Sequence, residues 1–369
     1  MPFTESERKD IAAQCTQFLA YRPGGTLSEK LHEIADSPYA LVGNDNYGSG
    51  GFTTQLEREV AGMLGKEAAV FMPSGTMAQQ IALRNWCDRA GNNTVAFHPT
   101  CHLEIHEQGA YRELHHLKAV LLGEKSRLFT LKDLEAVREK FAVLLVELPQ
   151  REIGGQLPSW EELCEICRWA QERGIKTHLD GARLWECAPF YGRSYAEIAA
   201  LFDSVYVSFY KILRGLPGAM LAGPADLIAE SRIWLRRHGG NLVTLAPNAV
   251  AAKVGMDAHL PRIGEYCQKA AEIAGALHGL EGITVRPENP PTNMMHLLFK
   301  GDKDKLEEAF WEVARDTGML ICSRLFPTEE PDVWKMEVNV SNTTMSLDPR
   351  VLRESMARVL ASPLGAKLG

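Results

Sequence analysis

The sequence predicts an α/β protein with a large domain, built on a mostly parallel central sheet flanked by helices, and a smaller C-terminal α+β domain. Three observations predict this fold. Short apolar runs alternate with helical patterns over most of the chain, turn signals separate them, and the alternation changes near residue 256. We therefore expect an N-terminal arm over residues 1–38, a large domain over 39–256 and a small domain over 257–369.

The composition is that of a globular protein. Of the 369 residues 45 % are hydrophobic and 24 % are charged, which allows two well-packed domains. The 40 basic and 47 acidic residues give a net charge of −7, without the basic stripe that binding to nucleic acid requires. The start of the chain does not resemble a signal peptide, and no apolar run would span a bilayer. Eight cysteines are too few for a disulfide scaffold, so we expect a cytoplasmic protein without membrane contact.

The N-terminal elements follow from helical spacing. Ile11, Phe18 and Leu19 predict a helix that residues 22–26 interrupt. A second helix is expected over residues 53–65, where apolar positions recur at helical spacing up to a glycine. The apolar run at 68–72 then predicts a strand, which a Pro-Ser-Gly-Thr turn at 73–76 connects to another helix.

The same alternation continues along the large domain. Short apolar runs predict buried strands over residues 94–97, 119–122, 141–146, 176–179 and 204–208. Helical patterns at 132–140 and 159–173 separate several of them. Strands that alternate with helices form mostly parallel sheets, and such sheets bind ligands at the carboxyl ends of their strands.

The C-terminal region has a different pattern. A helix over residues 245–254 continues over 263–277, and the segments that follow contain fewer strands. The predicted strands are 282–285, 294–299 and 334–338, beside two further helices. This arrangement predicts the small α+β domain.

Polar residues at two strand ends give the first indication of chemistry. Asp180 follows one apolar strand and Lys211 follows another. Neither position is typical of a charged residue that is merely exposed on the surface. Pyridoxal phosphate requires both groups, an amine for its aldehyde and a carboxylate for its ring nitrogen. It also requires a phosphate site, and the turn at residues 73–76 offers backbone N–H groups at a helix N-terminus and two hydroxyls.

The chain resembles the L-threonine aldolase and beta-eliminating lyase family of fold-type I pyridoxal-phosphate enzymes, which share the fold of aspartate aminotransferase. The similarity runs from about residue 39 to residue 223, with a weaker match at 292–294. Five segments carry it in order: 71–78 (FMPSGTMA), 101–109 (CHLEIHEQG), 154–155 (GG), 178–184 (HLDGARL) and 202–211 (FDSVYVSFYK).

The resemblance implies a role for each matching residue. Lys211 would bind the cofactor covalently, Asp180 would pair with its ring nitrogen, and His102 would stack on its ring. These three residues are the expected catalytic group. The resemblance also implies that Ser74, Gly75, Thr76, Arg183 and Ser208 contact the cofactor, the first three through its phosphate. Arg183 would serve the cofactor's phenolic oxygen or the substrate carboxylate.

The chain departs from the family pattern in the segments that would bind substrate. Residues 20–26 replace a family Arg-Ser-Asp-Thr segment, and Gln150 occupies the place of a family histidine near the substrate hydroxyl. Lys335 replaces an arginine that holds the carboxylate, and Arg214 stands where the family often has glycine. The implied substrate-binding residues are therefore Arg183, Gln150 and Lys335.

These observations predict a pyridoxal-phosphate lyase that cleaves a threonine-like β-hydroxy-α-amino acid to glycine and an aldehyde. An amide at Gln150 cannot take a proton, so the base would be His106, Glu104, a bound water or a substrate phosphate. A β-eliminating lyase, an amino-acid racemase and a cofactor-binding protein without catalysis are the alternatives. We expect a homodimer or homotetramer, and no metal, because the histidines near His102 lack the spacing of a metal site.

Overall fold

The computed structural model describes residues 2–19 and 26–362. The chain forms two compact units. The large unit comprises Gly25–Glu152 and Leu157–Arg262, and the small unit comprises Met1–Gly24, Ile153–Gln156 and Ile263–Gly369. The domain boundaries placed from the sequence after residues 38 and 256 stay a prediction.

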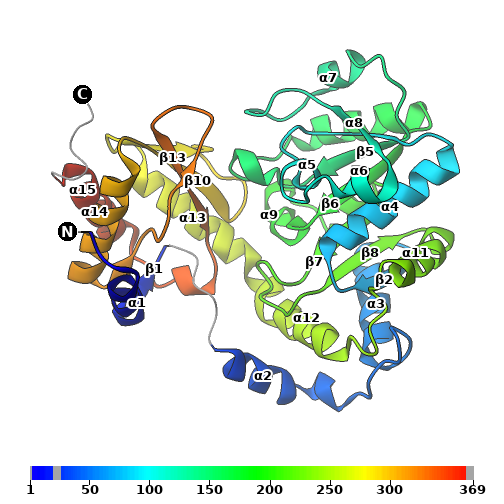
Figure 1. The fold of residues 1–369 in the computed structure, drawn as a ribbon, viewed down its shortest axis with the longest axis horizontal. Coiled ribbons are helices and arrows are strands. Elements are labelled where there is room, and N and C mark those ends of the chain that lie inside the picture. Colours follow the sequence, from blue (N-terminus) through cyan, green and yellow to red (C-terminus); the bar gives the residue numbers. More distant parts are fainter. Residues whose placement is uncertain (1, 20–25, 363–369) are drawn as a thin grey trace. The chain divides into compact units, whose positions relative to one another are not determined.

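The large unit is built on a seven-stranded sheet in the order β2-β8-β7-β6-β5-β3-β4. Figure 1 labels β2, β5, β6, β7 and β8 of this sheet. Its strands are β2 (Ala68–Met72), β3 (Thr94–Phe97), β4 (Lys118–Leu121), β5 (Val143–Glu147), β6 (Lys176–Gly181), β7 (Ser204–Ser208) and β8 (Ala219–Gly223). Every pair from β7 to β4 is parallel, whereas β8 runs antiparallel to both of its neighbours. The mostly parallel sheet predicted from the sequence is therefore confirmed.

Helices α3 (Gly51–Met63), α4 (Gly75–Ala90), α8 (Trp160–Glu172) and α11 (Ala225–Arg237) pack on the strands of this sheet. The other helices of the large unit are α2 (Leu27–Ala35), α5 (His102–Ile105), α6 (Ala110–His115), α7 (Leu131–Glu135), α9 (Ala188–Tyr191), α10 (Tyr195–Ala199) and α12 (Ala246–His259), and α2 packs against α12. Short 3₁₀ helices add η1 (Pro38–Leu41), η2 (Arg151–Ile153), η3 (Leu184–Glu186) and η4 (Leu260–Arg262). Helix α4 packs against β8, β7 and β6, and Ile81 of α4 and Leu221 of β8 belong to one buried cluster.

Most predicted elements of the large unit lie where the sequence placed them. The strands predicted at 68–72, 94–97 and 204–208 have the same bounds as β2, β3 and β7. The helix predicted over 132–140 is shorter, because only Leu131–Glu135 is helical. Strand β8 was not predicted, since its sequence AMLAG contains no β-branched residue.

The small unit contains a four-stranded antiparallel sheet in the order β12-β13-β10-β9. Its strands are β9 (Ile283–Arg286), β10 (Met294–Lys300), β12 (Phe326–Pro327) and β13 (Val333–Asn339), and a separate parallel pair joins β1 (Gln17–Phe18) to β11 (Met319–Leu320). The helices are α1 (Glu5–Gln14), α13 (Ile263–Leu277), α14 (Lys303–Thr317) and α15 (Pro349–Ala361), with the 3₁₀ helix η5 (Asn342–Thr344).

The N-terminal helix is shorter than its apolar spacing suggested. Helix α1 contains Ile11 but ends at Gln14, and Phe18 lies in β1. Phe18 packs with Trp311 and Leu320 in a buried cluster, so burial in a strand explains its apolar character. The departure from the family pattern at residues 20–26 lies almost wholly outside the described residues.

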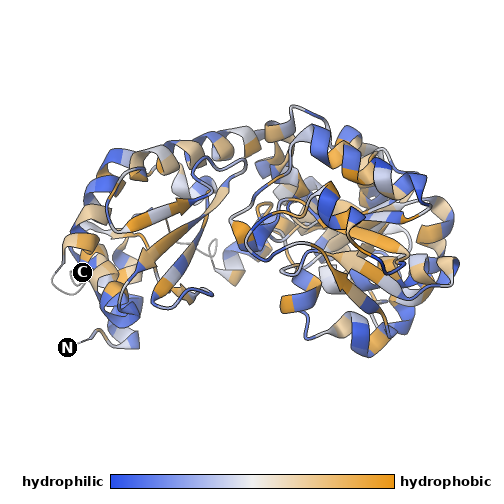
Figure 2. Cartoon of the chain, turned by 90° about the horizontal axis from the view of Figure 1, so that it is seen from above, coloured by the Kyte–Doolittle hydropathy of each residue, from blue (hydrophilic) through white to orange (hydrophobic). Residues whose placement is uncertain are grey.

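Hydrophobic residues concentrate on the strands of both units, and hydrophilic residues are common on the helices (Figure 2). Among the described residues, no helix combines the length and the apolar character that a membrane span requires.

Candidate active site

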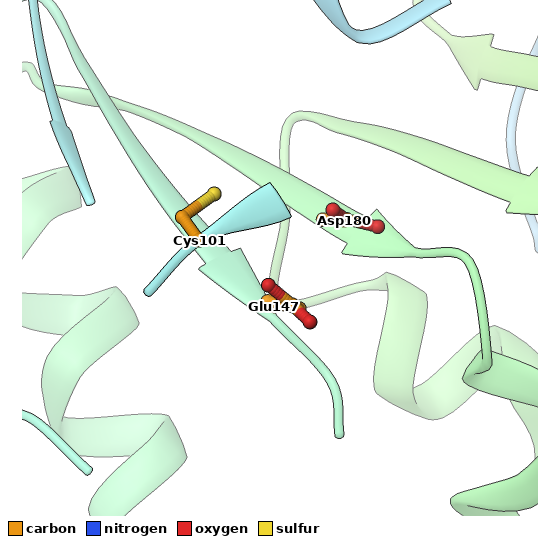
Figure 3. Close-up of side chains that lie close together, drawn as sticks. All are labelled: Cys101, Glu147 and Asp180. Atoms are coloured by element: carbon orange, nitrogen blue, oxygen red, sulfur yellow. The ribbon is translucent and has the colours of Figure 1, made fainter. Parts of the chain in front are cut away.

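Three buried polar side chains meet at the carboxyl ends of the central strands (Figure 3). Glu147 ends β5, Asp180 lies near the end of β6, and Cys101 precedes α5 in the loop after β3. The Cys101 Sγ atom and one carboxylate oxygen each of Glu147 and Asp180 lie within 4.8 Å of one another. Burial raises the pKa of the Cys101 thiol, so this side chain stays protonated between two carboxyl groups.

Asp180 is held by two donors. The Gln79 side-chain Nε2 donates to Oδ2 at 2.8 Å, and the Ala182 backbone N–H donates to Oδ1 at 3.1 Å. Gln79 comes from α4, which packs directly on the sheet. Because Asp180 is only 1 % exposed, these contacts fix the direction in which its carboxylate points.

Lys211 follows β7 in a neighbouring loop, and its amine has an altered proton affinity. Burial and, to a smaller extent, the positive charge of Arg183 outweigh the opposing effect of Asp180 and Glu147, and together these influences lower the pKa of Lys211 to about 8. A lysine with this pKa has a much larger fraction of neutral, nucleophilic amine near neutral pH than an exposed lysine.

The N-terminus of α4 offers backbone N–H groups that are suited to an anion. Ser74 is the N-cap residue, but its side chain makes no capping hydrogen bond to the helix. The first backbone N–H groups of this 16-residue helix therefore have no side-chain cap, which suits a phosphate. A Cβ atom at Gly75 would collide with the hydroxyl of Tyr206, so only glycine allows the helix to start this close to β7.

His102 begins α5 and is oriented by a carboxylate. Its Nδ1 lies 2.9 Å from Oε1 of Glu107, and the Gln80 side chain donates to the other Glu107 oxygen at 3.1 Å. The His102 side chain is 37 % exposed, whereas the Glu107 side chain is 2 % exposed. The imidazole thus has a fixed orientation and an accessible face.

Glu147 connects the loops that surround the site. Its carboxylate accepts hydrogen bonds from the backbone N–H groups of His102 and Arg151, at 3.3 and 3.1 Å, and from the Gln150 side chain at 3.3 Å. Burial, together with the nearby negative charge of Asp180, raises the pKa of Glu147 to about 7.

The other residues expected from the sequence lie at several places. The Arg183 side chain is 12 % exposed and its Nε lies 3.9 Å from Glu186. The Ser208 hydroxyl donates to the carbonyl oxygen of Ala182 at 2.7 Å, beside Asp180. Gln150 is buried in the large unit, whereas Lys335 lies on β13 of the small unit.

Sequence reasoning did not identify Gln79, Glu107 and Glu147, the residues that orient the site. Gln79 lies in α4 one helical turn after Gly75, and Glu147 directly follows the strand predicted at 141–146. Their positions next to predicted site residues could have indicated them. The contacts themselves arise only when α4, α5 and the strand ends come together.

The residues of this site fit pyridoxal phosphate. The donor set contains an amine with a lowered pKa, a buried and oriented carboxylate, an uncapped helix N-terminus and an accessible imidazole. These groups match the cofactor's aldehyde, ring nitrogen, phosphate and ring face in turn.

Comparison with protein families and characterised proteins gives consistent matches. The model of the beta-eliminating lyase family matches residues 33–299. Low-specificity L-threonine aldolase 1 of Arabidopsis thaliana is 27 % identical over 296 residues, which cover 76 % of this chain and 81 % of that protein. The low specificity L-threonine aldolase of Escherichia coli K12 is 28 % identical over 266 residues, covering 69 % and 77 %.

Solved structures match over nearly the whole chain. A Listeria monocytogenes protein, provisionally described as an L-allo-threonine aldolase, is 41 % identical with a TM-score of 0.91, covering 96 % of this chain and 98 % of that one. An Exiguobacterium protein, provisionally described as an aromatic amino acid beta-eliminating lyase/threonine aldolase, is 40 % identical with a TM-score of 0.90, covering 96 % and 99 %. The threonine aldolase of Leishmania major has a TM-score of 0.71 at 18 % identity, which shows the same fold.

Proposed function

Because the chain belongs to the beta-eliminating lyase family, we propose that it uses pyridoxal phosphate to cleave a threonine-like β-hydroxy-α-amino acid into glycine and an aldehyde. The observation that carries the proposal is the joint placement of Lys211, Asp180 and the uncapped start of α4 in one unit. The names of the similar proteins supply the substrate class.

Each residue has a defined task in this proposal. Ser74, Gly75 and Thr76 bind the phosphate, Asp180 pairs with the ring nitrogen, and Lys211 provides the covalent attachment. When bound, pyridoxal phosphate supplies an electron sink for the pair of electrons left at the substrate's α-carbon. His102 covers the ring face, and Glu107 holds its imidazole in place.

The substrate contacts and the assembly state are finer parts of the proposal. We assign the substrate carboxylate to Arg183, which carries a positive charge, and the region near the substrate hydroxyl to Gln150. The substrate-binding role of Lys335 stays a prediction from the sequence. Ser208 supports the turn after Asp180 through its bond to Ala182. A cytoplasmic location and a homodimer or homotetramer stay predictions.

The test is product analysis with the holoenzyme. We expect L-threonine, L-allo-threonine or phenylserine to give equal amounts of glycine and aldehyde, and Lys211→Ala to abolish this release together with the cofactor's bound absorbance. Keto acid and ammonia would contradict aldol cleavage and indicate β-elimination, whereas inversion at the α-carbon would indicate a racemase.

A further inference from the structure

The proposed cleavage needs a base for the β-hydroxyl proton, and Gln150 does not provide one. Its side-chain Nε2 donates to the carbonyl oxygen and the hydroxyl of Thr100, at 3.4 and 3.3 Å, and to Glu147 at 3.3 Å. An amide nitrogen that donates these bonds has no basic lone pair. Another group at the site must accept the proton.

A histidine and a carboxylate pair up next to Gln150 in the same unit. The Nε2 atom of His106 lies 2.9 Å from Oε1 of Glu152. The Arg151 side chain donates from Nη1 to the same Glu152 oxygen at 2.8 Å, and that Nη1 is 3.2 Å from His106 Nε2. Arg151 therefore helps to hold the Glu152 carboxylate beside the imidazole.

His106 also lies beside the residue that we place on the cofactor. The ring centroids of His102 and His106 are 5.1 Å apart, because the short helix α5 brings their side chains together. The His106 side chain is 40 % exposed and the Glu152 side chain is 15 % exposed. The imidazole is thus accessible to a small molecule, whereas the carboxylate that contacts it is mostly buried.

Glu104, another candidate base in this segment, is engaged elsewhere. Its Oε2 accepts a hydrogen bond from the Tyr111 hydroxyl at 2.6 Å. This contact connects Glu104 to α6, and the same hydrogen bond contributes to the high pKa of Tyr111. Glu104 thus helps to attach α5 to α6.

We propose that His106 is the base that takes the substrate's β-hydroxyl proton and that Glu152 positions it. This inference rests on the proposed function. This role requires the tautomer in which the Nε2–H of His106 donates to Glu152, and Nδ1 is then the nitrogen that takes up the proton. The O–H electron pair becomes the second bond of the aldehyde carbonyl, and the Cα–Cβ pair remains at Cα. Transfer of one proton to Cα then completes glycine and balances the reaction.

Two reactions of the same holoenzyme, aldehyde release and exchange of the glycine α-proton, distinguish a base role of His106 from a structural role. Aldehyde release requires loss of the β-hydroxyl proton, whereas exchange of the glycine α-proton with deuterated water does not. We expect His106→Gln to lower kcat for aldehyde release by about 100-fold or more, while glycine exchange and the cofactor's bound absorbance stay at wild-type values.

Two further variants sharpen the experiment. Glu152→Gln should lower kcat for aldehyde release by less than His106→Gln does, since the imidazole remains but its oriented negative partner is lost. His116→Asn is the matched control, because His116 is exposed, lies in the same stretch of chain and has φ 54°, which asparagine tolerates. Added imidazole should restore part of the release in His106→Gln.

The outcomes distinguish the inference from the proposed function. Wild-type aldehyde release by His106→Gln would overturn the role of His106 and leave aldol cleavage intact. A parallel loss of aldehyde release and glycine exchange would overturn it too, because the histidine would then support the site as a whole. If the wild-type holoenzyme exchanges the glycine proton but releases no aldehyde from any substrate, the proposed function fails.

Discussion

Burial changes the proton affinity of two groups at the centre of the site. It lowers the pKa of Lys211 to about 8 and raises the pKa of Glu147 to about 7, so in both cases the charged form is disfavoured. The two effects have opposite consequences for charge. Near neutral pH, the amine becomes easier to deprotonate and the carboxyl becomes easier to protonate.

The pH dependence of cofactor attachment should follow Lys211. Because only the neutral amine attacks the aldehyde, we expect the rate at which apoprotein captures pyridoxal phosphate to rise with pH, to be half-maximal near pH 8 and to level off about one pH unit higher. A lysine-containing model peptide should continue to gain rate up to about pH 10. Stopped-flow absorbance measures both rates, and identical profiles would contradict the lowered pKa.

Glu147 should make the cofactor-free protein less stable as the pH rises. Its carboxyl binds more protons in the folded than in the unfolded state between pH 4.5 and about 7, so its contribution to the free energy of unfolding falls over that range. The Glu147→Gln variant lacks this carboxyl, so its free energy of unfolding does not fall with pH for this reason. The melting temperature of the variant, relative to wild type, should therefore rise from about pH 5 to about pH 8.

The control for this measurement is Glu113→Gln. The Glu113 side chain is 70 % exposed, so its removal should shift the melting temperature by nearly the same amount at both pH values. A relative melting temperature of Glu147→Gln that does not change with pH would rule out a raised pKa at Glu147.

The sequence predicted the position of single residues better than their contacts. Asp180 and Lys211 could be identified because each follows an apolar strand, and the structure places both at the same edge of the sheet. Their roles stay predictions. Gln79 could not be assigned as the partner of Asp180, because that contact exists only once α4 has packed on β6.

Among the elements, the strands were predicted well where apolar side chains dominate. Strands β2, β3 and β7 are buried runs with clear ends. Strand β8 (AMLAG) contains no β-branched residue that would indicate a strand, and its pairing with β2 and β7 determines its conformation. Tertiary contacts therefore supply what local propensity lacks.

The start of α4 gives a prediction about cofactor binding. Gly75→Ala places a methyl group against the Tyr206 hydroxyl, and Tyr206 is only 2 % exposed, so the first turn of α4 must move. We expect the affinity for pyridoxal phosphate to fall by about tenfold or more, since the phosphate contacts depend on that turn. An absorbance titration of the apoprotein measures the change.

Gly62→Ala is the matched control for this substitution. Gly62 lies in α3 of the same unit, and a Cβ there would contact nothing within 4 Å. This variant should bind the cofactor as the wild type does. Equal affinity for all three proteins would show that the start of α4 does not hold the phosphate.

For the molecule as a whole, the proposed cofactor residues all come from the large unit, from the segments that contain Ser74, His102, Asp180 and Lys211. Between the segments that contain His102 and Asp180, the chain enters the small unit, because Ile153–Gln156 belongs to the small unit. In that short segment, a Cβ at Gly154 would collide with the carbonyl oxygen of Arg286, so backbone packing within the small unit explains one glycine of the family motif.

Cofactor binding should therefore stabilise the two units unequally. A ligand stabilises the part of the fold that contacts it. We expect pyridoxal phosphate to increase amide hydrogen-exchange protection at the start of α4 and in the loops after β3, β6 and β7. Exchange in β10 and β13 should stay unchanged, and a uniform gain in protection across both units would contradict this assignment.

The pairing of β2 with β8 also affects how the chain is made. Strand β2 lies at the edge of the sheet and joins it only through β8, which follows far later in the sequence. At typical rates of translation, on the order of ten seconds pass between synthesis of the two strands. During that time the nascent chain contains the apolar strand β2, whose partner β8 has not yet been synthesised. A chain released before residue 223 would keep this strand unpaired and would be prone to aggregate.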